Sequence, residues 1–339
     1  MKPIALEQGY VKTLGISNSA FSKPRIILIL GLIALLLLGS CSGHKSIVTW
    51  THFENQTQTI NSYRIPVYKL GKLLLLKGAI HGDTGYFIFD TGAPGLVLND
   101  QHFKNSYSDP TRQVTGVNGQ IHDARVCKVG QLQLGEVIFK INRADVTKLG
   151  DIEKKRNVKI LGLMGVNLFR GLELEIDLHQ EELRIYKTDQ QGQRLADTTG
   201  KLVSGKIAMP FKFRGSLIEL QANINDHYYR IAFDSGSEIL LFDKELATRD
   251  KIETRLISIK SLLGTDGSKP GIELRQLENI KIGVSLNKIT AMLIDFKNLR
   301  SHGLNVDGVI GYDLMTMGVV TINFQTRTFQ IKPYCKGKA

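Results

Sequence analysis

An internal repeat constrains the fold of this 339-residue chain more than any other feature of its sequence. Shifted by 144 residues, the sequence matches itself without a gap for about 35 positions, and residues 87–98 fall on residues 231–242. Each of these segments has an apolar run, then Asp-Thr-Gly or Asp-Ser-Gly, then another apolar run. Further on, residues 162–168 match residues 308–314. The repeat predicts two lobes with the same architecture.

The repeated segments indicate that both lobes are mainly β. They are short and rich in β-branched and aromatic residues, with turn residues at intervals of about ten positions. We expect an N-terminal lobe over residues 63–187 and a C-terminal lobe over residues 206–333, each long enough to bury its own core. The polar stretch 188–205 has no counterpart in the other copy and is predicted to be the linker between the lobes.

The N-terminus has the pattern of an export signal. An apolar run at residues 26–38 is too short for a bilayer span of about 20 residues, which favours a signal-peptide core. The ending Leu38-Gly39-Ser40-Cys41 resembles the bacterial lipobox, which implies a signal peptide over residues 1–40, lipidation of Cys41 and a tether over residues 41–62. The expected product is an exported, membrane-anchored lipoprotein, with Ser42 favouring the outer membrane over the inner one. An uncleaved signal anchor is the alternative.

Composition narrows the function classes. Lys and Arg outnumber Asp and Glu by 44 to 32, but the excess is dispersed and no basic run is interleaved with aromatic residues, so no nucleic-acid partner is expected. A solvated surface and attraction to anionic lipid or acidic substrates both remain open. The chain has no Gly-x-Gly, no Cys-x-x-Cys and no His-Glu-x-x-His, so we expect neither a cofactor nor a metal. Whether Cys127 and Cys335 pair is left open.

The acidic residue of each Asp-Thr/Ser-Gly motif suggests a shared site. Two equivalent lobes usually pack about a pseudo-twofold axis, which would bring Asp90 to face Asp234. Carboxyls that close share a proton, so one can act as general base on a water and the other as general acid toward a carbonyl oxygen. Such a pair hydrolyses an amide without a metal or a covalent intermediate. We expect the hydroxyls of Thr91 and Ser235 to bond across the axis.

These residues resemble the catalytic loops of aspartic proteases of the retropepsin/pepsin group. The resemblance covers roughly residues 63–333 and implies two β-barrel-like lobes related by a pseudo-twofold, with the active site between them. It implies that Asp90 and Asp234 are catalytic. The other matching positions imply support of the active-site loops, and they are Thr91, Gly92, Ala93, Ser235, Gly236 and Ser237 in the loops themselves, with Met164, Gly165, Ile310 and Gly311 in the elements that brace them.

Two predicted hairpin turns occupy the sequence place of the flap in this group. Asn-Gly and Asp-Gly pairs favour tight turns between strands. Residues 111–123 lack the Tyr of pepsin-like flaps, and each lobe is shorter than a pepsin lobe, so two similar flaps are expected, as in a fused retroviral dimer. The flap candidates are Gly116, Val117, Asn118 and Gly119 in the first lobe and Gly264, Thr265, Asp266 and Gly267 in the second.

The expected function is that of a monomeric aspartic endopeptidase acting on peptides or unfolded proteins. The alternative is a catalytically inactive peptide-binding lipoprotein with the same fold. The two loops differ at one position, where Ser237 stands in place of Ala93. Because a hydroxyl can donate a hydrogen bond to a carboxylate and favour its ionised form, we expect Asp234 to carry the charge and Asp90 the proton.

Overall fold

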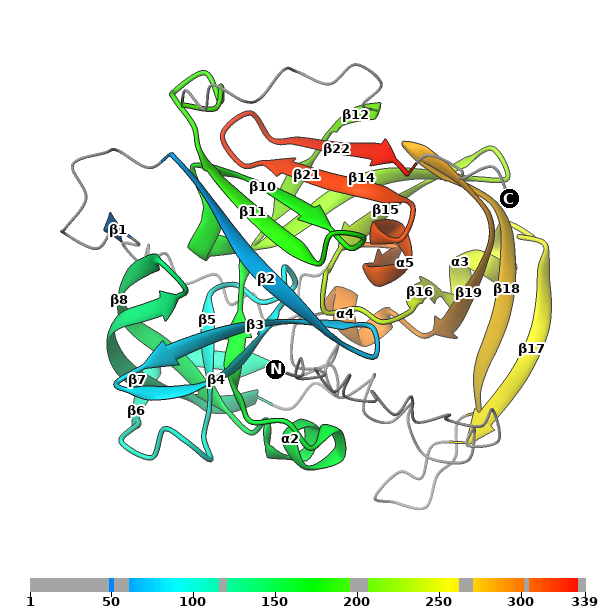
Figure 1. The fold of residues 1–339 in the computed structure, drawn as a ribbon. Helices are drawn as coiled ribbons and strands as arrows, with labels where there is room; N and C mark the ends of the chain where they lie inside the picture. The colour runs from blue at the N-terminus through cyan, green and yellow to red at the C-terminus, as the bar shows by residue number, and fades with distance from the viewer. Residues whose placement is uncertain are drawn as a thin grey trace, which may run out of the picture.

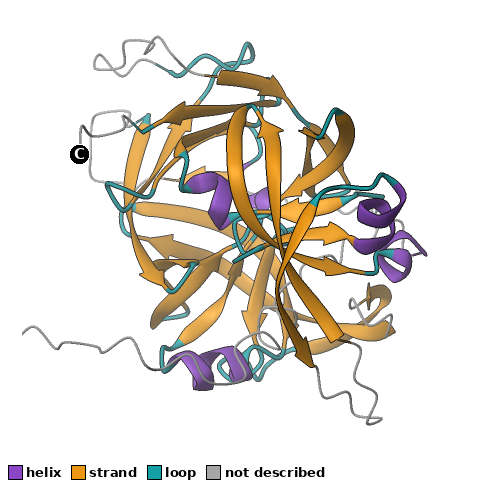
Figure 2. Cartoon of the chain, turned by 90° about the vertical axis from the view of Figure 1, so that its right-hand side faces the viewer, coloured by secondary structure: helices purple, strands orange, loops and turns teal. Residues whose placement is uncertain are grey.

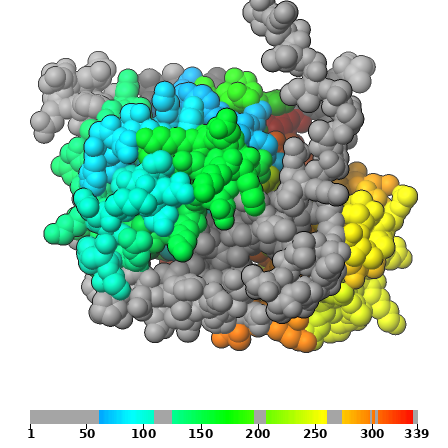
Figure 3. Space-filling model, turned by 90° about the horizontal axis from the view of Figure 1, so that it is seen from below, coloured from blue at the N-terminus to red at the C-terminus, as the bar shows by residue number. Residues whose placement is uncertain are grey.

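The computed structural model describes residues 49–51, 61–115, 121–195, 207–261, 271–301 and 305–334. Strands dominate these residues, and the helices are short (Figures 1 and 2). The two lobes lie side by side, with the N-terminal lobe in blue to green and the C-terminal lobe in yellow to orange (Figure 3). The prediction of two homologous, mainly β lobes is confirmed.

The N-terminal lobe is a closed barrel of six strands. Pairing between the first and last strands in the ring, at Ala79 with Gln133 and Ile80 with Leu132, closes it. In ring order the strands are β3 (Leu73–Ile80), β4 (Asp83–Phe89), β9 (Ile160–Met164), β5 (Leu96–Asn99), β8 (Val137–Thr147) and β7 (Ile121–Leu134). Outside the ring lie β6 (Tyr107–Thr115), which pairs with β7, the helix α2 (Gly150–Arg156) and the 3-10 helix η1 (Val166–Phe169).

The C-terminal lobe repeats this barrel. Pairing of Asn223 with Lys281 and of Ile224 with Ile280 closes the ring. In ring order the strands are β14 (Leu217–Ile224), β15 (His227–Phe233), β20 (Gly308–Ile310), β16 (Leu240–Asp243), β19 (Val284–Ile294) and β18 (Gly271–Ile282). Outside the ring lie β13 (Lys212–Arg214), β17 (Thr254–Ser261) and the helices α3 (Lys244–Arg249), α4 (Lys297–Ser301) and α5 (Tyr312–Met315).

The sequence repeat produces a repeat of burial. Strands β3 and β14 begin with four buried residues and then follow the same order of exposed and buried positions to their ends. Strands β5 and β16 are buried at all four positions, as expected for strands covered on both faces. Phe89 packs edge-to-face on Phe169 in one lobe, and Phe233 packs on Phe329 in the other. Each barrel therefore has an apolar core directly beneath its Asp motif.

A six-stranded sheet joins the lobes. Strands β10 and β21 pair antiparallel where the lobes meet, and Leu174 lies opposite Ile322 (Figure 1). The sheet order is β12 (Ile207–Pro210), β22 (Thr328–Pro333), β21 (Gly318–Asn323), β10 (Leu172–Asp177), β11 (Glu182–Lys187) and β2 (Ser62–Leu70). Each lobe contributes three strands, and their backbone hydrogen bonds cross the lobe boundary. The lobes are thereby held in a fixed orientation.

The structure departs from the predicted tether at one point. Within the predicted range 41–62, Thr49–Thr51 forms strand β1 and pairs antiparallel with Ile138–Lys140 of β8. Strand β5 pairs with β8 only at residues 145–147, so the same edge of β8 at residues 138–140 is free to pair with β1. The signal peptide and Cys41 lie outside the described residues. Among the residues that are described, no helix is long and apolar enough to cross a membrane.

The first part of the predicted linker folds back onto the joining sheet. Arg194 pairs with Glu173 at 2.6 Å and with Glu175 at 3.0 Å, and its guanidinium lies 3.5 Å from the centre of the Tyr186 ring. Asn323 of the C-terminal lobe donates to the same Glu173 at 2.8 Å. Because these groups are largely shielded from water, the linker start is fixed against both lobes.

Candidate active site

Each Asp of the repeated motif begins the loop after a central barrel strand. Asp90 follows β4, which runs parallel to β9, and Asp234 follows β15, which runs parallel to β20. The backbone N–H of Asp90 donates to the carbonyl of Met164 at 3.0 Å, and that of Asp234 donates to Ile310 at 2.9 Å. The parallel strands therefore fix the start of each loop at equivalent places.

The glycines of the bracing elements allow the loops to pack closely on them. A Cβ at Gly165 would lie less than 3 Å from the carbonyl of Ala93, and one at Gly311 would overlap the carbonyl of Asp234. Just beyond each glycine, Val166 N–H donates to Ala93 O at 3.0 Å and Tyr312 N–H donates to Ser237 O at 2.9 Å. Both glycines thus pack directly against the Asp loops, and the supporting role that the resemblance implies for them stays a prediction.

The two loops are joined by reciprocal hydrogen bonds between Thr91 and Ser235. The backbone N–H of each residue donates to the hydroxyl of the other at 2.9 Å. The Thr91 hydroxyl donates to Phe233 O at 3.3 Å, and the Ser235 hydroxyl donates to Phe89 O at 2.9 Å. All these groups are buried, and the expected bonding across the axis is confirmed.

Asp90 and Asp234 are brought together by this arrangement, and both are fully buried. Gly92 N–H donates to Oδ1 of Asp90 at 2.9 Å and to Oδ1 of Asp234 at 3.2 Å. Ala93 N–H adds a bond to Asp90, and Gly236 N–H adds one to Asp234. A Cβ at Gly92 would lie 2.6 Å from Cγ of Asp234, so only glycine fits there.

The two oxygens of each carboxyl differ in their partners. We call Oδ1, which accepts from backbone N–H groups, the inner oxygen, and Oδ2 the outer oxygen. Oδ2 of Asp90 and Oδ2 of Asp234 are buried and have no hydrogen-bond partner within the part of the chain that the structure describes. Buried polar atoms without a partner are rare in folded proteins and costly. Each inner oxygen thus accepts from backbone donors, whereas each outer oxygen has no such bond among the described residues.

Burial sets the protonation of the pair. It raises the pKa of both carboxyls, because desolvation disfavours the charged form. The pKa of Asp90 lies well above its ordinary value, since the nearby Asp234 charge adds to the effect of burial. Backbone N–H donors act in the opposite direction but do not cancel it. Two buried carboxyls this close share one proton and titrate as a pair.

The Ser237 hydroxyl does not make the expected hydrogen bond to Asp234, and the expected division of proton and charge between Asp90 and Asp234 stays a prediction. The Ser237 hydroxyl donates to the carbonyl of Ile239 at 2.9 Å. A short side chain readily bonds a backbone group two residues away, and here that local bond is formed in place of one to Asp234. The hydrogen bonds to Asp234 come from the backbone N–H groups of Gly92 and Gly236 instead.

The flap candidates cannot be placed at the site. Residues 116–120 and 262–270, which include both predicted turns, lie outside the described residues. The strands that flank them form two antiparallel hairpins, with Thr115 opposite Ile121 and Ser261 opposite Gly271. The hairpins are therefore present in both lobes, and the role of their tips stays a prediction.

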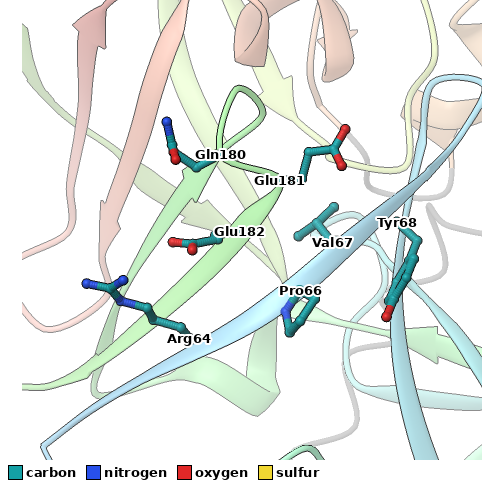
Figure 4. A pocket seen from close by; sticks show the side chains of 7 residues that line it. All are labelled: Arg64, Pro66, Val67, Tyr68, Gln180, Glu181 and Glu182. Atoms are coloured by element: carbon teal, nitrogen blue, oxygen red, sulfur yellow. The ribbon is translucent and has the colours of Figure 1, made fainter. Parts of the chain in front are cut away.

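One hollow on the surface is remote from this chemistry. It has a volume of about 330 Å³ and lies over β2 and β11, and no residue of either Asp motif lines it (Figure 4). Within the described ranges, no group of three or more His, Cys, Asp or Glu side chains is arranged to hold a metal. Cys127 is buried and free, and Cys335 lies outside the described residues.

Two ion pairs between the lobes escaped the sequence reasoning. Arg156 at the end of α2 pairs with Glu238, which directly follows Ser237. Lys72 in the turn between β2 and β3 pairs with Asp313 of α5. Residues of opposite charge separated by 82 and 241 positions give no local pattern that could have revealed them.

Comparison with known proteins agrees with this geometry. The model of a family described as aspartyl protease matches twice, over residues 76–168 and 220–314, which together make up more than half of the chain. The chain belongs to the aspartyl protease family. Each matched segment of this aspartyl protease chain holds one motif Asp and one bracing glycine, Asp90 with Gly165 and Asp234 with Gly311.

The other comparisons add little. Basic 7S globulin from soybean is similar in structure, with a TM-score of 0.47 at 8% sequence identity, over 81% of this chain and 95% of that one. No curated protein sequence matches the chain.

The reciprocal bonds between the loops predict coupling between two substitutions. Thr91→Val and Ser235→Ala should each lower the free energy of unfolding by about 1–3 kcal/mol, because each leaves a buried N–H without its acceptor. The double variant should lose less than the sum, by at least about 0.5 kcal/mol. Urea unfolding measures all three, with Thr248→Val, whose exposed hydroxyl bonds only within α3, as the near-neutral control. Strict additivity would contradict the coupling.

The raised pKa of Asp90 predicts that the substitution of this residue by Asn, its neutral amide analogue, stabilises the fold. In the unfolded chain an Asp ionises near pH 3.9, whereas native Asp90 keeps its proton to a higher pH. The native state therefore loses stability as the pH rises from about 3.9 to the raised pKa of native Asp90. Asp90→Asn should therefore raise Tm by about 2 °C or more at pH 7 and leave it almost unchanged below about pH 4. Thermal unfolding at both pH values tests this. Asp226→Asn, an exposed substitution in the turn before β15, should show no such difference.

Proposed function

We propose that this chain is an aspartic endopeptidase that hydrolyses peptide bonds with a water activated between Asp90 and Asp234. The observation that supports this most is the buried pair itself, in which one Gly92 N–H reaches both inner oxygens. Family membership agrees with the proposal. A module that only bound peptides would gain nothing from burying two carboxyls in contact, so the geometry favours catalysis over the peptide-binding alternative.

The proposed division of labour assigns the shared proton to Asp90, whose pKa is raised by both burial and the neighbouring charge, and the charge to Asp234. Charged Asp234 takes a proton from a water, whose oxygen forms a bond to the carbonyl carbon of the substrate. Asp90 gives its proton to the carbonyl oxygen, and a neutral tetrahedral intermediate results. Asp234 then gives its proton to the amide nitrogen, and Asp90 takes a proton from a hydroxyl of the intermediate as the C–N bond breaks, which releases the acid and the amine and restores the pair. The backbone donors hold the inner oxygens throughout, so the outer ones carry the protons.

The proposed substrate is an extended peptide or an unfolded protein. A hairpin on each lobe could pair with such a chain as with an added strand, while apolar pockets hold its side chains. Both motif residues come from one chain, so we propose a monomer with an internal pseudo-dimer. From the sequence, we propose that lipid on Cys41 holds the enzyme at the periplasmic or outer surface of a membrane, with the outer membrane favoured.

Cleavage of an unfolded protein across a pH series tests the proposed reaction. Activity should fall toward alkaline pH as the pair loses its shared proton above the raised pKa of Asp90, and fall toward acid pH as Asp234 gains a proton, at a pH above the ordinary pKa of an Asp because its pKa is also raised. Asp90→Asn and Asp234→Asn should each lower kcat by at least about 10³-fold. Asp226→Asn serves as the matched control. Activity that survives in the double Asn variant would refute the protease proposal.

The membrane anchor calls for a separate experiment. Expressed from its full gene in a bacterium, the wild-type chain should sediment with membranes and start at a lipid-modified Cys41 when its mass is determined. Cys41→Ser should abolish the modification. A wild-type chain that keeps residues 1–40 on the membrane would instead support the uncleaved signal anchor.

A further inference from the structure

We propose that the ion pair between Arg156 and Glu238 positions the second catalytic loop against the first lobe. Nη2 of Arg156 lies 2.7 Å from Oε1 of Glu238, and their side chains are only 23% and 11% exposed. Arg156 belongs to the N-terminal lobe, whereas Glu238 directly follows the motif that starts at Asp234. This inference rests on the proposed endopeptidase function.

A second contact brings the same two lobes together at the same place. A Cβ at Gly71 would lie 2.8 Å from Nη1 of Arg156 and 3.7 Å from Oε2 of Glu238, so the turn between β2 and β3 sits on the ion pair. The next residue, Lys72, pairs with Asp313 at 2.9 Å. Asp313 comes two residues after Gly311, which braces the second loop. Both C-terminal partners therefore adjoin active-site elements.

The repeat shows that these charges are not a by-product of the shared architecture. At the equivalent positions of the other half, Glu238 is replaced by Pro94 and Asp313 by Asn167. Lys72 is replaced by Ser216 in the turn before β14. On that side of the pseudo-twofold, contact is made by Arg170, whose guanidinium lies 4.2 Å from the centre of the Phe213 ring. Within the described residues, the ion pairs of Arg156 and Lys72 across the lobe boundary thus adjoin the loop of Asp234 and not that of Asp90.

The loop of Asp234 carries the carboxyl that accepts a hydrogen bond from the opposite lobe. Oδ1 of Asp234 depends on a 3.2 Å hydrogen bond from Gly92 of the opposite lobe, the longest of the four backbone bonds to the pair. A small shift of the second loop would break this bond and separate the carboxyls. Catalysis by positioned groups is sensitive to displacements of about 1 Å. Arg156 therefore acts as a positioning residue, through Glu238.

Kinetics of a small variant set test the inference. Arg156→Met and Glu238→Gln should each lower kcat about tenfold and change KM less than about twofold, because the geometry of the pair changes and peptide binding does not. The double variant should be no worse than the more impaired single variant. Arg156→Lys, which keeps the charge, should recover most of kcat. Lys159→Met breaks the exposed ion pair of Lys159 with Asp83 within one lobe and should leave kcat unchanged.

Hydrogen exchange measured on the intact chain gives a second readout. Amides of residues 235–237 should exchange faster in Arg156→Met than in Lys159→Met, at equal distance from each Tm. Equal kcat and equal exchange in the two variants would overturn the inference. Where Arg156→Met fails to fold, the isosteric Glu238→Gln carries the same comparison. A wild-type chain without cleavage activity would refute the proposed function, and the exchange comparison would still decide whether the ion pair fixes the loop.

Discussion

The contact between two buried carboxyls is the constraint on which the rest of this structure depends. Desolvation and mutual repulsion both oppose it, and the molecule offsets them with one retained proton and with backbone N–H donors to the inner oxygens of Asp90 and Asp234. Backbone donors stabilise a carboxylate most when the fold already holds them in place. The loops must therefore be rigid, and glycine must stand where Cβ atoms would collide with the opposite carboxyl.

Rigidity comes from placing each loop between elements that cannot move separately. A parallel strand pair anchors each Asp through its own backbone N–H, and a bracing glycine lets the next turn pack against the loop. Thr91 and Ser235 then tie the two loops to each other. The joining sheet fixes the orientation of the two lobes, because β10 and β21 are hydrogen-bonded across the boundary between them. Local and global contacts thus support the same geometry.

Much of this could be predicted from the sequence, because a pattern that occurs in two equivalent segments is stronger evidence for a structure than one that occurs once. The match of residues 87–98 with residues 231–242 identified both barrels, the meeting of Asp90 with Asp234 and the bonding between Thr91 and Ser235. What escaped prediction depends on side chains without a periodic or local pattern. The Ser237 hydroxyl donates to the carbonyl of Ile239 instead of to Asp234. Strand β1 pairs with an edge of β8 that exists only in the folded barrel, and Arg156 pairs with a Glu of the other lobe.

The departures from symmetry bear directly on the chemistry. In two identical halves the shared proton would have no preferred carboxyl. Here the N–H of Gly92 reaches across the lobe boundary to Asp234 as well as to its own Asp90, whereas the N–H of Gly236 bonds only Asp234. Asp234 thus receives one donor from each lobe, whereas both donors to Asp90, from Gly92 and Ala93, belong to its own lobe. Because one of the donors to Asp234 belongs to the opposite lobe, the hydrogen bonding of this carboxyl depends on how closely the lobes dock, and in the proposed reaction the contacts at the lobe boundary act on the group assigned as the general base.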